Sequence, residues 1–189
     1  MTLNDIRIVA KLLKENHIHQ VCYFNLGEPF LAPDIYSQLK IIRQENPEIK
    51  IIISTNGSRL NTDEKRNAAL FCNEIMFSID GVDDRTLSHY QRGSVFEKTY
   101  INMKQLVAFR DNKGLKEPVI EWKYVLFNWN DNPEMIEKAV NLAKEGSVDV
   151  ISFYPTRVPI YGISWRYFLT PFYKTLGEKS WKGREVRIR

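Results

Sequence analysis

Four short polar segments follow apolar runs in the sequence, at points where binding or catalysis could be carried out. Glu28 is held between a glycine and a proline after the apolar run 21–26, and residues 54–57, 78–81 and 127–128 follow three later runs. In a parallel α/β protein the carboxyl ends of the strands form the mouth of the ligand site. Four polar strand ends in order therefore predict one pocket that contains a carboxylate, although each segment taken alone is also typical of a plain turn.

Helical and strand-like patterns alternate along the chain, which predicts an α/β fold with a parallel sheet. The expected strands are 19–26, 49–55, 74–80, 119–127 and 148–154. The expected helices are 3–16, 33–46, 62–72, 96–111 and 133–144, with a polar connection at 83–93. After residue 155 the pattern is lost. The aromatic and basic extension 156–189 is expected to pack one or two short helices against a domain formed by residues 1–155.

The composition is that of an ordinary globular protein, with 43% hydrophobic and 26% charged residues among 189. No apolar stretch approaches the roughly 20 residues that span a bilayer. The first residues show no signal peptide, so we expect a cytoplasmic protein without a membrane partner. A net charge of +4 is mild and does not indicate a nucleic-acid partner.

The two cysteines, Cys22 and Cys72, lie far apart in apolar surroundings and do not form a pair with metal-ligand spacing. His17 and His19 are two residues apart, and no carboxylate or cysteine completes a ligand set with them. The sequence therefore predicts two buried structural thiols and no metal site formed by its own residues.

One expected strand carries charges on a single face. Within 119–127, Glu121 and Lys123 share a face, while Trp122 and Tyr124 belong to the opposite, apolar face. A parallel strand buried on both sides is normally apolar on both faces. The pattern indicates either a polar lumen where these two residues lie near a substrate, or an internal Glu121–Lys123 ion pair on a half-exposed strand.

At this point the sequence resembles the core of the radical SAM enzymes, over about residues 1–155. The resemblance lies in the order and spacing of several segments, namely residues 26–31 (Leu-Gly-Glu-Pro-Phe-Leu), 54–57 (Ser-Thr-Asn-Gly), 78–81 (Ser-Ile-Asp-Gly), 90–93 (Tyr-Gln-Arg-Gly), 96–97 and 146–151. It implies a partial TIM-type (β/α)₆ barrel with parallel strands, from which this chain lacks the first strand.

The resemblance also implies contacts with S-adenosylmethionine. Glu28 would accept hydrogen bonds from its α-amino group, Ser78 would reach the ribose hydroxyls, and Arg92 would pair with its carboxylate. Asn56 would order the pocket floor. The full set of implied cofactor-binding positions is Gly27, Glu28, Pro29, Asn56, Ser78, Asp80, Arg92 and Asn128.

The family's chemistry implies a [4Fe–4S] cluster that three cysteines hold in a CxxxCxxC motif, and an electron donor that reduces it. With the cluster, S-adenosylmethionine is cleaved to a 5′-deoxyadenosyl radical that abstracts hydrogen from a substrate. This chain contains no such motif, and Cys22 and Cys72 cannot replace it. We therefore expect either a fragment of a longer enzyme or a homologue that has lost the cluster. A missing first strand would expose the strand 21–26 to self-association.

Other functions stay open. A cluster-less homologue could act as a non-catalytic binding or partner protein. A different (β/α)-barrel enzyme would require a glycine-rich phosphate loop after a late strand, and residues 155–159 are poor in glycine. A nucleic-acid-binding module would rest only on the basic end of the chain, 179–189. Neither a catalytic residue nor a substrate can be assigned from the residues.

Overall fold

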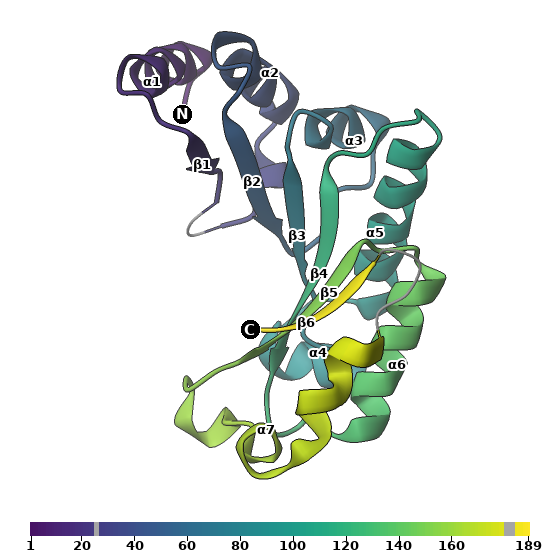
Figure 1. The fold of residues 1–189 in the computed structure, drawn as a ribbon. Helices are drawn as coiled ribbons and strands as arrows, with labels where there is room; N and C mark the ends of the chain where they lie inside the picture. The colour runs from purple at the N-terminus through teal and green to yellow at the C-terminus, as the bar shows by residue number, and fades with distance from the viewer. Residues whose placement is uncertain (25–26, 180–183) are drawn as a thin grey trace.

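The computed structural model describes residues 1–24, 27–179 and 184–189 of the chain. Within them, six parallel strands form one sheet whose spatial order, β1 to β6, is also their order in the sequence (Figure 1). The strands are β1 (Gln20–Cys22), β2 (Lys50–Thr55), β3 (Glu74–Ser78), β4 (Val119–Leu126), β5 (Val150–Pro155) and β6 (Glu185–Ile188). The predicted parallel α/β fold is confirmed.

Helices connect consecutive strands, and α3, α5 and α6 lie along one face of the sheet (Figure 1). The α-helices are α1 (Leu3–Glu15), α2 (Ile35–Glu45), α3 (Asp63–Ala69), α4 (Asp84–Tyr90), α5 (Phe96–Asp111), α6 (Pro133–Glu145) and α7 (Trp165–Leu169). The 3-10 helices are η1 (Pro29–Leu31), η2 (Ile160–Gly162) and η3 (Pro171–Lys179). None of the helices in the described part of the chain has the length and apolarity needed to cross a membrane.

The two faces of the sheet differ in chemistry because side chains alternate along each strand. Toward the helices, Ile53, Phe77, Trp122 and Phe153 are fully buried in one apolar core. Burying a side chain of this size contributes about 1.5–3 kcal/mol, so this face supplies most of the cohesion. The opposite face carries the alternate positions of the same strands, many of them polar. We call this opposite face the lumen face.

Cys22 lies on the lumen face of β1 and is exposed, so the prediction of two buried thiols is wrong for this residue. Its register partner is Ile52 of β2. β1 is an edge strand of the sheet and is short, and no described strand pairs with its outer side near Cys22. Cys72 is buried as predicted.

Two elements were absent from the sequence expectations. β6 pairs in parallel with β5, and its Val186 and Ile188 pack on the core. α4 occupies most of the predicted polar connection, with Asp83 as its N-cap, whose carboxylate accepts a hydrogen bond from the Thr86 amide at 2.9 Å. The expected short helices of the tail are present as α7 and the 3-10 segments.

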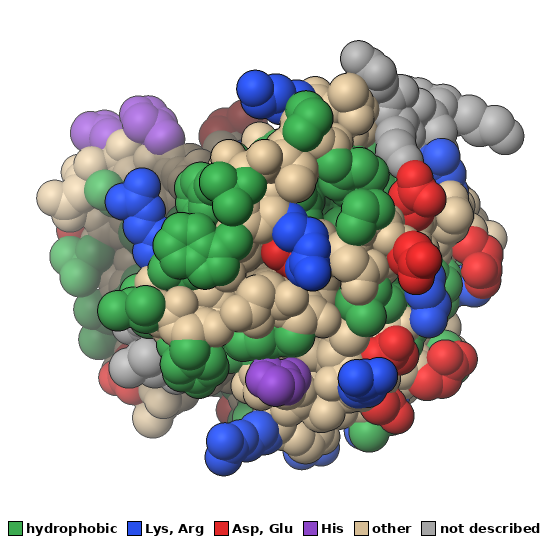
Figure 2. Space-filling model, turned by 90° about the horizontal axis from the view of Figure 1, so that it is seen from below, with side chains coloured by type: hydrophobic (Ala, Val, Ile, Leu, Met, Phe, Trp, Pro, Cys, Tyr) green, Lys and Arg blue, Asp and Glu red, His purple; other side chains and the backbone are tan. Residues whose placement is uncertain are grey.

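Asp131 anchors this tail. It is buried at the start of α6, and its carboxylate accepts hydrogen bonds from Ser164 at 2.7 Å and from Arg166. The Tyr173 hydroxyl donates to its backbone carbonyl. Large apolar side chains of the anchored segment remain exposed, and Figure 2 shows hydrophobic side chains gathered at this end of the molecule.

Arg110 joins α5 to the starts of β4 and β5. Its side chain is 4% exposed and forms an ion pair with Asp149, and its Nη1 donates to the Pro118 carbonyl at 2.8 Å. Asp149 also accepts from the Ile120 amide at 2.8 Å. A buried charge of this kind is tolerated because each of its donors has a partner.

We therefore expect Arg110→Met to lower the free energy of unfolding by about 3 kcal/mol, because it removes the buried cation paired with Asp149 and leaves the buried Pro118 carbonyl without its donor. Urea denaturation at pH 7 measures this loss. Lys11→Met is the control, since its ion pair with Glu15 is exposed at both ends and contributes about 1 kcal/mol or less. Equal losses in the two variants would contradict the role assigned to Arg110.

Candidate active site

A polar cavity of about 360 Å³ lies at the carboxyl ends of β2 and β3, where it is bordered by the loop after β1 and the loop after α4. Its lining residues are Phe24, Gly27, Glu28, Ser54, Thr55, Asn56, Ser78, Gln91, Arg92 and Ser94. Five of the sequence-predicted cofactor positions are among them: Gly27, Glu28, Asn56, Ser78 and Arg92. Three of the four polar segments, at 28, 54–56 and 78, thus border one cavity, while the segment 127–128 is not part of its lining.

The Glu28 carboxylate ties the loop after β1 to the end of β2. Its Oε1 accepts from the Thr55 hydroxyl at 2.6 Å and from the Phe30 amide at 3.2 Å. The bond from Phe30 makes Glu28 the N-cap of η1. Its Oε2 accepts from the Asn56 amide at 2.7 Å. An ionised carboxylate has about four acceptor positions, so one remains for a ligand.

Two glycines permit this geometry. Gly27 has φ +134°, a backbone conformation that residues with a Cβ rarely adopt. Gly57 has φ +73°, and a Cβ there would lie 2.9 Å from the ring of Phe77. The glycine before Glu28 is therefore required by the backbone, and the glycine after Asn56 by both the backbone and the core.

Gln91 fixes the far wall of the cavity. It forms the C-cap of α4, and its Nε2 donates to the Ser78 carbonyl at 3.0 Å and to the Asp80 carboxylate at 2.9 Å. These bonds hold the loop after α4 against the end of β3. Arg92 follows directly in the chain and is exposed, and it makes no ion pair with any described residue.

Asp80 is 1% exposed and does not line the cavity. Its carboxylate accepts from the Val125 amide at 2.8 Å as well as from Gln91, so it connects β3, β4 and α4. Burial is the largest influence on the pKa of Asp80. The hydrogen bonds and the charge of Lys123 lower this pKa, but burial outweighs them and raises it to about 6. The structure thus places Asp80 behind the cavity wall.

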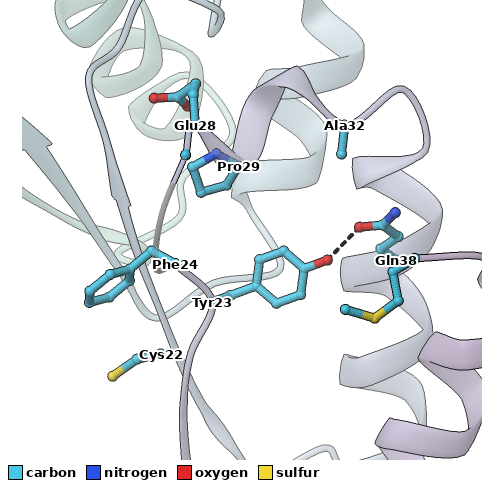
Figure 3. A pocket seen from close by; sticks show the side chains of 9 residues that line it. Cys22, Tyr23, Phe24, Glu28, Pro29, Ala32 and Gln38 are labelled. Atoms are coloured by element: carbon cyan, nitrogen blue, oxygen red, sulfur yellow. Dashed lines mark hydrogen bonds between the residues drawn. The ribbon is translucent and has the colours of Figure 1, made fainter.

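The remaining predicted positions lie elsewhere. Asn128 is exposed, and its side-chain amide donates to the Tyr161 carbonyl at 2.7 Å, so it contacts η2. Pro29 lines a neighbouring cavity of about 420 Å³ together with Tyr23, whose hydroxyl donates to Gln38. Figure 3 shows the Tyr23 ring lying along this second cavity with its hydroxyl toward Gln38. Phe24, Gly27 and Glu28 border both cavities.

Glu121 and Lys123 lie on the lumen face, one to two strands from the cavity. They do not form the ion pair considered from the sequence. Glu121 is buried and lies 3.8 Å from Arg189, while the Lys123 ammonium lies 5.3 Å from the centre of the Tyr154 ring. In the register, Lys123 is paired with Ser78, a cavity residue.

Sequence reasoning missed Thr55 and Gln91, whose contacts organise the cavity. Both stand inside segments that were singled out, next to residues that were assigned a role. A hydroxyl or amide directly beside a predicted ligand-binding residue was the available signal. Phe24, Ser54 and Ser94 line the cavity without any earlier assignment.

The described residues contain no group of three or more His, Cys, Asp or Glu side chains arranged for a metal ion. The sequence holds two cysteines in total, one exposed on β1 and one buried after α3. An iron–sulfur cluster takes thiolate ligands, and these two positions do not supply a set of three. The residues of this chain therefore do not fit such a cluster.

The pKa of Asp80 leads to a prediction for stability against pH. Because this pKa is higher in the folded state than in the unfolded state, the folded protein keeps the proton between about pH 4 and pH 6. The free energy of unfolding therefore falls as pH rises through this window, by about 3 kcal/mol from this residue. Asp80→Asn should remove that contribution.

Urea denaturation from pH 4 to pH 7 gives the free energy of unfolding of the wild type and of Asp80→Asn at each pH. The effect is measured as the change with pH in the difference between these two free energies. Asp63→Asn, which removes an exposed carboxylate, controls for the lost charge. Parallel pH profiles for the wild type and Asp80→Asn would show that burial does not raise this pKa.

Three solved structures illustrate the similarity in fold. Streptococcus suis SuiB bound to precursor peptide SuiA has 18% identity and a TM-score of 0.71, and the match covers 100% of this chain and 42% of that one. Native anSMEcpe with bound AdoMet has 17% identity and a TM-score of 0.61, covering 97% and 53%. TsrM, a radical S-adenosylmethionine methyltransferase from Kitasatospora setae, has 14% identity and a TM-score of 0.59, covering 80% and 28%.

This chain therefore spans about half or less of the length of these structures. No curated protein sequence matches it at a significant level. The family model described as the radical SAM superfamily matches residues 1–113, more than half of the chain. With the parallel sheet and the polar cavity at its strand ends, this match shows that the chain belongs to the radical SAM superfamily.

Proposed function

We propose that this chain binds S-adenosylmethionine in the polar cavity between Glu28 and Arg92. The observation that supports this most is that a carboxylate and a guanidinium border one cavity and each keeps bonding capacity for a ligand. The methionine part of S-adenosylmethionine is a zwitterion. Its ammonium matches the remaining acceptor position of Glu28, and its carboxylate matches Arg92.

The other cavity residues complete the assignment. Ser78 offers a hydroxyl for the ribose, while Asn56 has its side-chain oxygen engaged by the Ser58 amide at 2.9 Å and shapes the floor. Asp80 acts through Gln91, which it positions, and Asn128 acts through η2, which it holds in place. Gly27 and Pro29 set the path of the backbone around Glu28.

The family's radical chemistry depends on a cluster that the residues of this chain do not fit, so we assign none of its steps to them. The cluster, an electron donor and the substrate belong to the intact enzyme, for which we keep the expected cytoplasmic location. Since the chain has only two cysteines, a protein that binds S-adenosylmethionine without cleaving it is the second candidate. Release of 5′-deoxyadenosine under reducing, iron–sulfur-reconstituted conditions would exclude that second candidate.

Binding of S-adenosylmethionine tests the proposal directly. Arg92→Met should weaken binding by roughly ten- to hundred-fold, because it removes one charge-assisted hydrogen-bonding partner of the carboxylate. Isothermal titration calorimetry measures the dissociation constant. Arg92 is exposed and has no ion-pair partner among the described residues, so the variant should fold normally.

Two controls make the result specific. Arg85→Met removes an exposed arginine from α4 that does not line the cavity, and it should leave the affinity unchanged. Methylthioadenosine lacks the methionine amino and carboxyl groups, so its binding should not respond to Arg92→Met. A wild-type chain that binds neither compound would overturn the proposal.

We also propose that the outer edge of β1 mediates self-association. The His19 carbonyl accepts from the Lys50 amide at 2.9 Å, and the Tyr23 amide donates to the Ile52 carbonyl at 2.8 Å. Because alternate residues of a parallel strand bond to the same neighbour, the backbone groups of Cys22 point to the other side. No described strand pairs with that side, and a free edge of this kind is a template for another chain.

Cys22→Pro should reduce self-association, since it removes the outward amide while the bonds to β2 are kept. Cys22→Ser is the matched control, because it removes the thiol and keeps the amide. Light scattering after gel filtration at two protein concentrations gives the mass of each variant. Equal association in the two variants would exclude the edge of β1 as the contact.

A further inference from the structure

The lumen face of β4, β5 and β6 carries a group of polar side chains that the proposed S-adenosylmethionine site does not use. Ile151 and Phe153 of β5 are buried in the core, so the alternating Ser152 and Tyr154 belong to the lumen face. The register pairs Lys123 with Ser152, and neighbouring strands lie about 5 Å apart. These residues therefore form one patch beside the cavity residue Ser78.

Within this patch, Glu121 is already satisfied. The Tyr154 hydroxyl donates to its Oε1 at 3.1 Å, and Arg189 lies 3.8 Å from its Oε2. Burial and the adjacent Glu121 raise the pKa of Tyr154 to about 12, which keeps the hydroxyl protonated as the donor. Glu121 thus serves to hold Tyr154 and Arg189 in place.

Lys123 is not satisfied in the same way. Its ammonium lies over the Tyr154 ring, at 5.3 Å from the ring centre, and has no carboxylate within ion-pair distance among the described residues. The side chain is only half-buried, so a ligand can reach it. An ammonium has three donors, and an aromatic face leaves them without a hydrogen-bond acceptor.

Ser152 provides the second, independent observation. Its side chain is fully buried, and its Oγ has no hydrogen-bond partner among the described residues. A buried hydroxyl without a partner is unfavourable and uncommon in folded proteins. It lies on the same face as the Lys123 ammonium and on the adjacent strand.

We propose that Lys123 and Ser152 form a subsite for a carboxylate group of the substrate, one strand away from the proposed S-adenosylmethionine cavity. This inference rests on the proposed function for the identity of the neighbouring ligand. One carboxylate satisfies both groups, since it accepts from the ammonium and from the hydroxyl at once.

A carboxylate fits this place better than a phosphate. Arg187 is engaged by Glu185 at 2.5 Å, and Glu74 is paired with Lys50 at 3.1 Å. The same face also carries the buried carboxylate of Glu121. A dianion bound here would be repelled by Glu121, and only the Lys123 ammonium would be left to balance its two charges. A monoanion avoids most of that repulsion.

The probes are two capped tripeptides, acetyl-Gly-Glu-Gly-amide and acetyl-Gly-Gln-Gly-amide, together with inorganic phosphate. Each is titrated into the chain, with and without S-adenosylmethionine, and followed by NMR of the protein amides. The glutamate peptide should bind at least roughly ten-fold more tightly than the glutamine peptide, because only the former carries the charge. Shifts should centre on β4 and β5.

Lys123→Met should remove this preference, and Lys123→Arg should keep most of it. Ser152→Ala should weaken the binding of both peptides, because its hydroxyl donates to a carboxylate and to an amide oxygen alike. Ser152→Ala breaks no hydrogen bond with a described residue, so its melting temperature should not fall. Lys116→Met, in an exposed loop, controls for the change in net charge. Equal binding of the two peptides, a preference that survives in Lys123→Met, or tighter binding of phosphate than of the glutamate peptide would each overturn the subsite.

Binding of S-adenosylmethionine to the same samples separates the two proposals. If the wild type does not bind it but the peptide preference depends on Lys123, the carboxylate subsite stands and the proposed function falls. If S-adenosylmethionine binds and no peptide preference is found, the subsite falls and the proposed function stands.

Discussion

The hydrogen bonds to the Glu28 carboxylate are the interaction on which the cavity depends. β1 is three residues long and pairs with one described neighbour, so its own ladder gives the following loop little support. Glu28 supplies that support by accepting from Thr55, Asn56 and Phe30. The same carboxylate is therefore both a structural tie and the anion of the proposed site. Its roles are compatible because three donors leave one acceptor position open.

A second constraint acts across the whole sheet. Strand alternation gives the apolar positions to the helices and leaves the polar positions on the lumen face. Buried charges there must find partners, which explains why Glu121 is bonded to Tyr154 and lies close to Arg189. Lys123 and Ser152 differ from Glu121, because neither the ammonium of Lys123 nor the buried hydroxyl of Ser152 has a hydrogen-bond partner among the described residues.

The main strands could be predicted from the sequence because short β-branched apolar runs, such as the three isoleucines of β2, are typical of buried strands. The convergence of Glu28, Asn56 and Ser78 followed from their places at strand ends, whereas Arg92, in the loop after α4, was assigned through the family resemblance. β6 could not be predicted in the same way, since four residues of alternating charge and apolarity resemble an ordinary exposed tail. The direction in which the Asp80 side chain points could not be predicted from the sequence either. Asp80 follows Ser78 by two residues, yet its carboxylate turns toward β4 and Gln91, where burial outweighs contact with a ligand.

The strand order of the sheet has a consequence for how the protein is made. Each strand lies beside the strand that precedes it in the sequence, from β1 to β6. No strand has to wait for a partner that is synthesised much later, because each loop closure joins two strands that follow one another in the sequence. The described sheet can therefore grow one strand at a time as the chain leaves the ribosome, with β6 added after β5. Until β6 docks, the nascent protein exposes the edge of β5, which β6 then covers.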